Sequence, residues 1–152
     1  MTQPKHPLAR YQDLPRGDDG VVTLTDAQWR ERLSAEEFQI LRQGGTEPAG
    51  TGPLTNHEEP GDYHCAGCGL HLYTSEHKFH SGCGWPAFDD EVPNAVTRLE
   101  DRSYGRVRTE IRCRGCDGHL GHVFEGEQLT KKNVRHCVNS ASIVFAPKTP
   151  DS

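Results

Sequence analysis

The spacing of hydrophobic and polar positions divides the chain into a short helical part and a long extended part. Thr25 and Ser34 each precede, by three residues, a side chain that could close a capping box, at Gln28 and Glu37. Apolar residues flank both boxes, and Gly44 follows the second one, as is typical of a helix end. The pattern predicts two short helices at the start of the domain.

From Tyr63 onward the pattern favours strands. Residues 107–112 alternate, so that Val107, Thr109 and Ile111 share one face and charged residues share the other. Other short extended segments are predicted over 63–64, 70–73, 96–99, 123–124, 134–138 and 141–145. The expected fold is mainly β, with antiparallel sheets in a tent-like or barrel-like arrangement after two short N-terminal helices.

Composition and charge limit the classes of function. Residues 1–20 are rich in Pro and Gly, which predicts a flexible leader that packs little surface. One domain is expected over 21–147, followed by a flexible tail over 148–152. The net charge of −5 argues against nucleic-acid or membrane partners. Because the chain lacks a long apolar run and a signal-peptide core, we expect a cytoplasmic protein.

Four cysteines form two C-x-x-C pairs, Cys65/Cys68 and Cys113/Cys116. Four thiolates are a common ligand set for structural zinc, which leaves no open position for water. Because the hydrophobic fraction is only 33%, a zinc ion that pins the sheets together would add needed folding free energy. Redox-active C-x-x-C pairs and iron–sulfur ligation are the alternatives, although no helix-forming sequence follows either pair.

Cys83 and Cys137 remain, and an even remainder in a reducing compartment suggests a catalytic or redox pair. Arg135 and Asn139 lie two residues to either side of Cys137, so on a strand they share its face, and Arg135 could stabilise a thiolate there. Trp85 follows the glycine-flanked Cys83 and, with Phe88, either lines an apolar pocket or packs in the core.

Three motifs together resemble the B-type methionine sulfoxide reductases, peptide-methionine (R)-S-oxide reductases. They lie at 78–86, 113–124 and 135–140, and the resemblance extends from Leu24 to Pro147. It implies a zinc-pinned antiparallel β fold and thiol-dependent reduction of the R epimer of methionine S-oxide. It also implies oxidised-methionine proteins or peptides as substrates and recycling by thioredoxin. We expect one structural zinc per chain and a monomer.

The resemblance also implies roles for individual residues. Cys137 would attack the sulfoxide sulfur and become a sulfenic acid. Many members of the family carry Ser or Thr at position 83, but here the position is Cys, and its glycine neighbours would let it swing toward Cys137 and resolve the sulfenic acid as a disulfide. His122, and less directly His119, would protonate the sulfoxide oxygen. Arg135 and Asn139 complete the expected catalytic set, and the expected substrate-binding residues are Trp85 for the S-methyl group, Phe124 and His80.

Two departures from the family pattern stand out. His136 occupies a position where many members have Tyr, and residues 125–133 lack a frequent Asp-Gly-Pro run. Another carboxylate, with Glu127 as the candidate, would then support the histidines, or else this loop faces solvent. The rival function is a non-catalytic, protein-binding zinc-knuckle module. Such a module would need the four paired cysteines but neither Cys137 nor the His119/His122 pair.

Overall fold

The computed structural model describes residues 8–102, 105 and 107–147. The predicted tail over 148–152 and the first seven residues of the leader lie outside this part of the chain. Within it, no helix is both long enough and apolar enough to cross a bilayer.

Two α-helices begin at the predicted capping boxes, α1 at Asp26–Arg32 and α2 at Ala35–Leu41. Thr25 accepts from the N–H of Gln28 at 3.2 Å, and the Gln28 side chain accepts from the N–H of Thr25 at 2.8 Å. The same reciprocal pair joins Ser34 and Glu37. The predicted helical start of the domain is confirmed, preceded by the short 3₁₀ turn η1 at Ala9–Tyr11.

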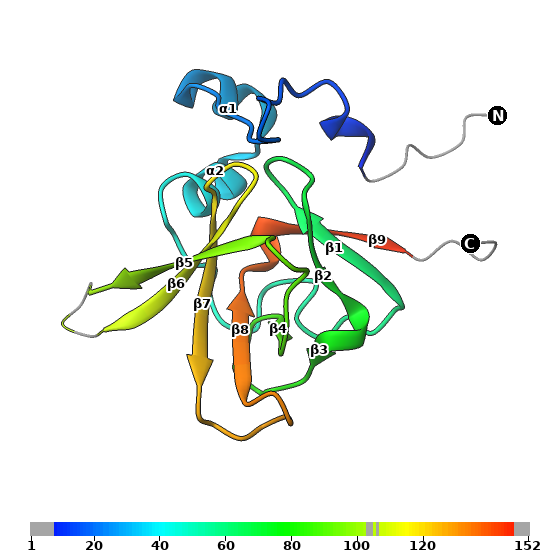
Figure 1. The fold of residues 1–152 in the computed structure, drawn as a ribbon, viewed down its shortest axis with the longest axis vertical. Coiled ribbons are helices and arrows are strands. Elements are labelled where there is room, and N and C mark those ends of the chain that lie inside the picture. The colour runs from blue at the N-terminus through cyan, green and yellow to red at the C-terminus, as the bar shows by residue number, and fades with distance from the viewer. Residues whose placement is uncertain (1–7, 103–104, 106, 148–152) are drawn as a thin grey trace.

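All strand pairs are antiparallel and form two sheets (Figure 1). The smaller sheet has the order β2-β1-β9, with β1 at Gly61–Cys65, β2 at His71–Thr74 and β9 at Ile143–Pro147. The larger has the order β3-β4-β8-β7-β6-β5. Its strands are β3 at Lys78–Phe79, β4 at Ala87–Phe88, β5 at Val96–Asp101, β6 at Arg108–Cys113, β7 at His119–Glu125 and β8 at Val134–Val138.

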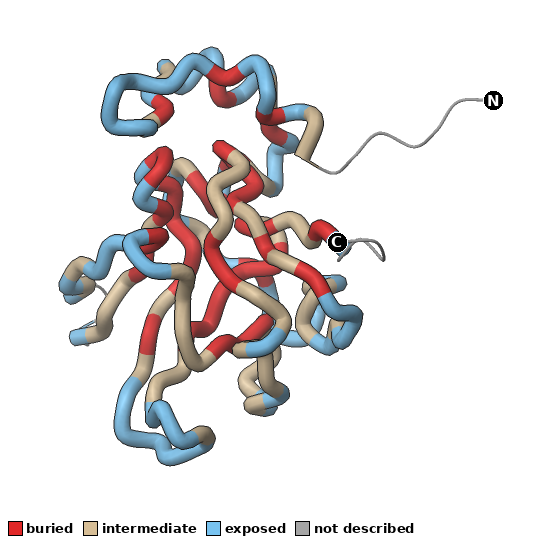
Figure 2. The backbone as a smooth tube through the Cα atoms, turned by 45° about the vertical axis from the view of Figure 1, so that its right-hand side comes forward, coloured by how far each residue is buried: buried red, intermediate tan, exposed pale blue. Residues whose placement is uncertain are grey.

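The mainly β, antiparallel prediction is therefore confirmed, but a closed barrel is not found among the described strands. Each sheet has two free ends in its strand order. Short 3₁₀ turns, η2 at Ser75–His77 and η4 at Ser140–Ser142, lead from β2 into β3 and from β8 into β9. Figure 2 shows that many of the buried residues lie along the strands in the middle of the molecule. The largest fully buried side chains include Tyr63, Tyr73, Phe88, Ile111 and Leu120.

A bulge in β7 determines which face of the sheet the His119 side chain lies on. Ile111 of β6 pairs with Gly121, but the next residue pairs with His119, so Leu120 is the extra residue. A bulge reverses the alternation of side chains. It therefore turns His119 to the face that carries His122, and the two rings lie 5.6 Å apart.

The described part of the N-terminal leader packs against the rest of the protein, which the sequence did not predict. Tyr11 and Leu14 are buried in the core, and the Tyr11 hydroxyl donates to the carbonyl of Ala66 at 2.8 Å. Arg16 donates to the carbonyl of Cys68 at 2.6 Å. The expectation of little packing was wrong for residues 8–16, because the turns around the paired cysteines present carbonyls that need donors. In Figure 1 this segment lies over one end of the sheets.

Candidate active site and metal centre

The four paired cysteines converge on one buried point. Their Sγ atoms all lie within 4.8 Å of one another, with Cys65 to Cys116 at 3.6 Å and Cys68 to Cys113 at 3.5 Å. A tetrahedral zinc site with Zn–S near 2.3 Å places its sulfurs about 3.8 Å apart, so the spacing fits zinc. The N–H groups of Gly67 and Gly115 point at Sγ of Cys65 and Cys113, each at 3.3 Å. This set of donors suits a cluster of thiolates.

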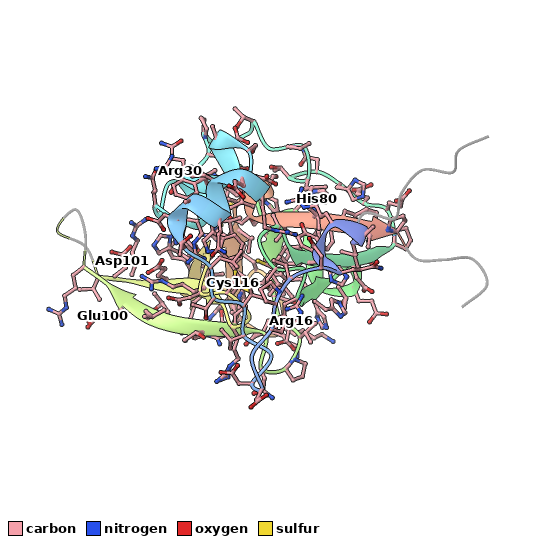
Figure 3. All side chains as sticks on the ribbon, turned by 90° about the horizontal axis from the view of Figure 1, so that it is seen from above. Arg16, Arg30, His80, Glu100, Asp101 and Cys116 are labelled. Carbon is pink, nitrogen blue, oxygen red and sulfur yellow. The ribbon has the colours of Figure 1, made fainter. Side chains whose placement is uncertain are left out.

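The N-terminal segment and α2 cover this cluster. Besides Tyr11 and Arg16, Arg10 donates to the carbonyl of Ala66 at 2.7 Å and Arg42 to the carbonyl of Cys116 at 2.8 Å. Figure 3, drawn from above, shows Arg16 and Cys116 in the region that this segment covers. Three guanidinium groups therefore surround a cluster that carries negative charge when zinc is bound.

The other two cysteines also meet. Sγ of Cys137 lies 3.0 Å from Sγ of Cys83, and Nη1 of Arg135 lies 2.6 Å from Sγ of Cys137. No swing of the glycine-flanked loop is needed to bring the two thiols into contact. The Cys137 thiol donates to Cys83, which lowers the pKa of Cys83 to about 5. The same hydrogen bond, together with burial, raises the pKa of Cys137 despite Arg135. The pair therefore shares one proton at neutral pH.

Arg135 is fixed on two sides. Its Nε lies 2.6 Å and its Nη2 lies 2.9 Å from the carboxylate of Glu127, and its guanidinium lies 4.6 Å from the ring centroid of Phe124. The prediction that Glu127 supports the histidines was therefore wrong. The loop after β7 extends along β8, so the Glu127 carboxylate reaches the charged Arg135 beside it.

Two other carboxylates support the histidines. Nε2 of His122 lies 2.8 Å from Asp101, the last residue of β5, and Nδ1 of His119 lies 2.6 Å from Glu110 of β6. Burial lowers the pKa of His122, although Asp101 acts to raise it. Burial acts to raise the pKa of Glu110, but the hydrogen bonds with His119 and Arg112 outweigh it and bring the pKa to about 2.

Sequence reasoning missed both carboxylates, although one pattern could have located Glu110. Glu110, His122 and Cys137 are successive partners across β6, β7 and β8. The alternation in residues 107–112 places Glu110 on the charged face, which is the face of the site. Asp101 has no such signal, because its contact depends on the pairing of β5 with β6.

A cavity of about 220 Å³ opens beside the cysteine pair. Cys137, Cys83, Trp85 and Phe124 line it, as predicted for a shared site, together with the following residues: Thr46, Arg108, Gly121, His122, Arg135 and Asn139. A side chain at position 121 would meet the carbonyl of Cys137, so glycine there lets β7 and β8 approach closely.

Two predicted site residues, His119 and His80, lie outside the cavity wall, and Phe88 takes the core-packing alternative. His119 is buried next to His122 but does not line the cavity. His80 is exposed and its Nε2 lies 2.7 Å from Glu58, so it is not part of the wall. Phe88 is fully buried against Tyr73 and belongs to the core.

His136 points away from the cavity, into the core. It is fully buried, its Nδ1 lies 3.0 Å from the hydroxyl of Tyr73 and its Nε2 lies 3.3 Å from Glu91. Burial lowers the pKa of His136 to about 4. The histidine that replaces the family's frequent Tyr is therefore a neutral imidazole on the core side of β8, the strand that carries Cys137.

Comparison with known proteins gives a consistent result. A SelR domain matches residues 33–147. A peptide methionine sulfoxide reductase MsrB of Synechococcus sp. (strain RCC307) is 48% identical over 137 residues, which is 90% of this chain and all of the relative. Peptide methionine sulfoxide reductase B5 of Arabidopsis thaliana is 53% identical over 87% of this chain and 94% of the relative.

A peptide methionine sulfoxide reductase MsrB of Agrobacterium fabrum (strain C58) is 50% identical over 83% of this chain and 93% of the relative. The domain match spans the paired cysteines, the β7 histidines and Cys137. The chain therefore belongs to the SelR-domain family of peptide methionine sulfoxide reductases.

Proposed function

We propose that this protein reduces methionine (R)-S-oxide in proteins or peptides to methionine, with Cys137 as the nucleophile. The observation that carries the proposal is the position of Cys137 Sγ on the cavity wall, with Arg135 at 2.6 Å on one side and Cys83 at 3.0 Å on the other. The choice of the R epimer rests on the resemblance to the B-type family.

The cavity offers what the reaction requires. The half-buried Trp85 and Phe124 provide apolar surface for the S-methyl group. The proton that the two thiols share passes from Cys137 to Cys83, and the Cys137 thiolate attacks the sulfoxide sulfur while its oxygen takes up a proton. The sulfur–oxygen bond and the new sulfur–sulfur bond then break as the hydroxyl passes to Cys137, which leaves a sulfenic acid and free methionine. A proton must reach that oxygen, and His122, held by Asp101, is the donor on the wall. His119 supports His122 from outside the cavity wall, with the two ring centroids 5.6 Å apart.

Cys83 then resolves the sulfenic acid. Its thiol attacks Cys137 Sγ, a disulfide forms, and the oxygen leaves as water. Because the two sulfur atoms already lie 3.0 Å apart, a small movement closes the bond. An external dithiol, for which we propose thioredoxin, restores both thiols. Asn139 holds the end of β8 through a hydrogen bond to the carbonyl of Leu120 at 3.1 Å.

The remaining parts have structural roles. Cys65, Cys68, Cys113 and Cys116 would hold one zinc ion that ties the turn after β1 to the turn after β6. Zinc supplies stability here and takes no part in the reaction. Two C-x-x-C pairs and a reactive cysteine pair suit a reducing compartment, for which we propose the cytoplasm. One chain contains every residue invoked, so we propose that a monomer is active.

A racemic sulfoxide peptide with excess dithiothreitol tests the proposal. We expect conversion to stop at one half, with only the S epimer left, as resolved by chiral chromatography. Cys137→Ser should give no product, because a serine hydroxyl stays protonated and reacts poorly with sulfur. No conversion by the wild type would favour the zinc-knuckle binding module, and full conversion would contradict the R assignment.

A further inference from the structure

One charged side chain is buried in the turn-rich segment between the helices and the first sheet. Residues 42–60 are all described, and among them only Glu47 is buried, at 5% exposure. Burial of a carboxylate costs free energy unless it is paired. An apolar side chain would fill the same space at lower cost, so packing alone does not account for a glutamate here.

The carboxylate of Glu47 makes one contact and leaves one oxygen over. Its Oε1 accepts from the N–H of Ala141 at 3.0 Å, whereas Oε2 is buried with no hydrogen-bond partner among the described residues. Ala141 lies in η4, the turn that directly follows β8 and Cys137. The carboxylate therefore anchors this segment to the end of the reactive strand.

The main chain of Glu47 holds two residues of the cavity wall. Its N–H donates to Oδ1 of Asn139 at 3.0 Å, and its carbonyl accepts from Nε1 of Trp85 at 2.9 Å. Asn139 and Trp85 both line the cavity and belong to segments far apart in sequence. Both are oriented by the same residue, so a shift of the main chain at Glu47 would move both.

A second contact ties this segment to the loop that carries the second thiol. The N–H of Gly50 donates to the carbonyl of Gly84 at 2.7 Å, directly after Cys83. Gly84 has a φ of 92°, and a side chain there would meet Ala49. The loop is therefore closely fitted against residues 47–50.

We propose that Glu47 is a positioning residue, whose buried carboxylate fixes the main chain that orients Trp85 and Asn139 around Cys137. This inference rests on the proposed function only for its catalytic consequence. The orientation of the Trp85 ring is a property of the folded protein without substrate.

The test follows the indole N–H of Trp85 by NMR. The chain has two tryptophans, so the indole signal that disappears in Trp85→Phe belongs to Trp85 and the remaining one to Trp29. We expect Glu47→Ala and Glu47→Asp to speed exchange of that proton with water by about tenfold. Aspartate keeps the charge but is one methylene too short to reach Ala141. Glu47→Gln keeps the acceptor and should retain slow exchange.

Kinetics and controls complete the test. With a sulfoxide peptide, Glu47→Ala should raise KM and lower kcat, with a combined loss of about a hundredfold in kcat/KM. Zinc content should stay at the wild-type value. Glu59→Ala removes an exposed carboxylate from the same segment and should change neither exchange nor kinetics.

Two results would overturn the proposal: slow exchange with wild-type KM in Glu47→Ala, or equal exchange rates in Glu47→Asp and Glu47→Gln. The second comparison decides the matter even if Glu47→Ala does not fold. If the wild type reduces no sulfoxide, the proposed function fails, while the exchange rates still test the role of Glu47.

Discussion

At the scale of single residues, the site depends on two pairs that share protons. Cys83 and Cys137 share one between two sulfur atoms, and His122 shares another with Asp101. In the cysteine pair the partner thiol has the largest effect on the pKa of Cys137, whereas burial has the largest effect on the pKa of His122. Arg135 was expected to lower the pKa of Cys137, but the contact with Cys83 and burial outweigh it in the reduced state.

Alkylation should reveal this sharing. Cys83 has a pKa lowered to about 5 by the hydrogen bond from Cys137, and it is less buried than Cys137. We expect iodoacetamide at pH 6.5 to modify Cys83 before Cys137 in the reduced wild type. Peptide mapping by mass spectrometry at short times gives the order. Modification of Cys137 first would show that Arg135 governs the pair.

The variant Asp101→Asn tests whether His122 donates the proton to the sulfoxide oxygen. Asp101 acts to raise the pKa of His122, so its removal should lower that pKa further. If protonated His122 supplies the proton, the alkaline limb of the kcat profile shifts to lower pH, and the rate at pH 8 falls by roughly tenfold or more. Arg102→Ala, which removes an exposed neighbouring charge, is the control. An unchanged profile would remove His122 from proton transfer.

At the scale of elements, strand β8 has two faces with different duties. One face carries Arg135 and Cys137 toward the cavity, and the other carries His136 into the core. The sequence predicted the strand and the shared face of Arg135, Cys137 and Asn139, because alternation is a local property. It did not predict that His119 and His122 share a face, since the bulge in β7 arises only from pairing with β6.

The buried His136 makes stability depend on pH. Its pKa is about 4 in the folded protein and near 6.5 when unfolded, so the unfolded state binds more protons below pH 6.5. Stability from this group is complete above about pH 6.5 and is lost as pH falls toward 4. Between pH 8 and 5.5 the free energy of unfolding should fall by about 1–2 kcal/mol.

Urea unfolding of the wild type and His136→Tyr at several pH values measures this difference. The variant should show a smaller loss over the same range, whatever its absolute stability. Zinc content is checked at each pH, so that metal loss is not mistaken for titration. Parallel curves for the two proteins would mean that another group titrates.

At the scale of the whole molecule, the N-terminal segment and the metal centre form one unit. The C-x-x-C spacing identified the four cysteines whose Sγ atoms converge on one point, because two close pairs of thiols have few other uses. The low apolar content of residues 8–16 predicted a flexible leader, but these residues pack against the turns around the paired cysteines. Their donors satisfy carbonyls of the turns around Cys68 and Cys65, a need that only the folded turns create.

Arg16→Ala should therefore weaken zinc retention. The guanidinium donates to the carbonyl of Cys68 and adds positive charge beside the thiolates, and its loss should speed zinc transfer to a colorimetric chelator by about tenfold. Arg102→Ala is the matched control, since Arg102 pairs only with exposed Glu100 among the described contacts. Equal rates in the two variants would show that the segment covers the metal without holding it.

The central claim is that Cys137 takes the oxygen of methionine sulfoxide and passes the oxidation to Cys83. One turnover with a stoichiometric (R)-sulfoxide peptide and no reductant tests it most directly, by mass spectrometry of peptide and protein together. We expect one reduced peptide per chain, a Cys83–Cys137 disulfide in the wild type, and a trappable Cys137 sulfenic acid in Cys83→Ser. Reduced peptide without any oxidised Cys137, or a disulfide among the four paired cysteines instead, would contradict it.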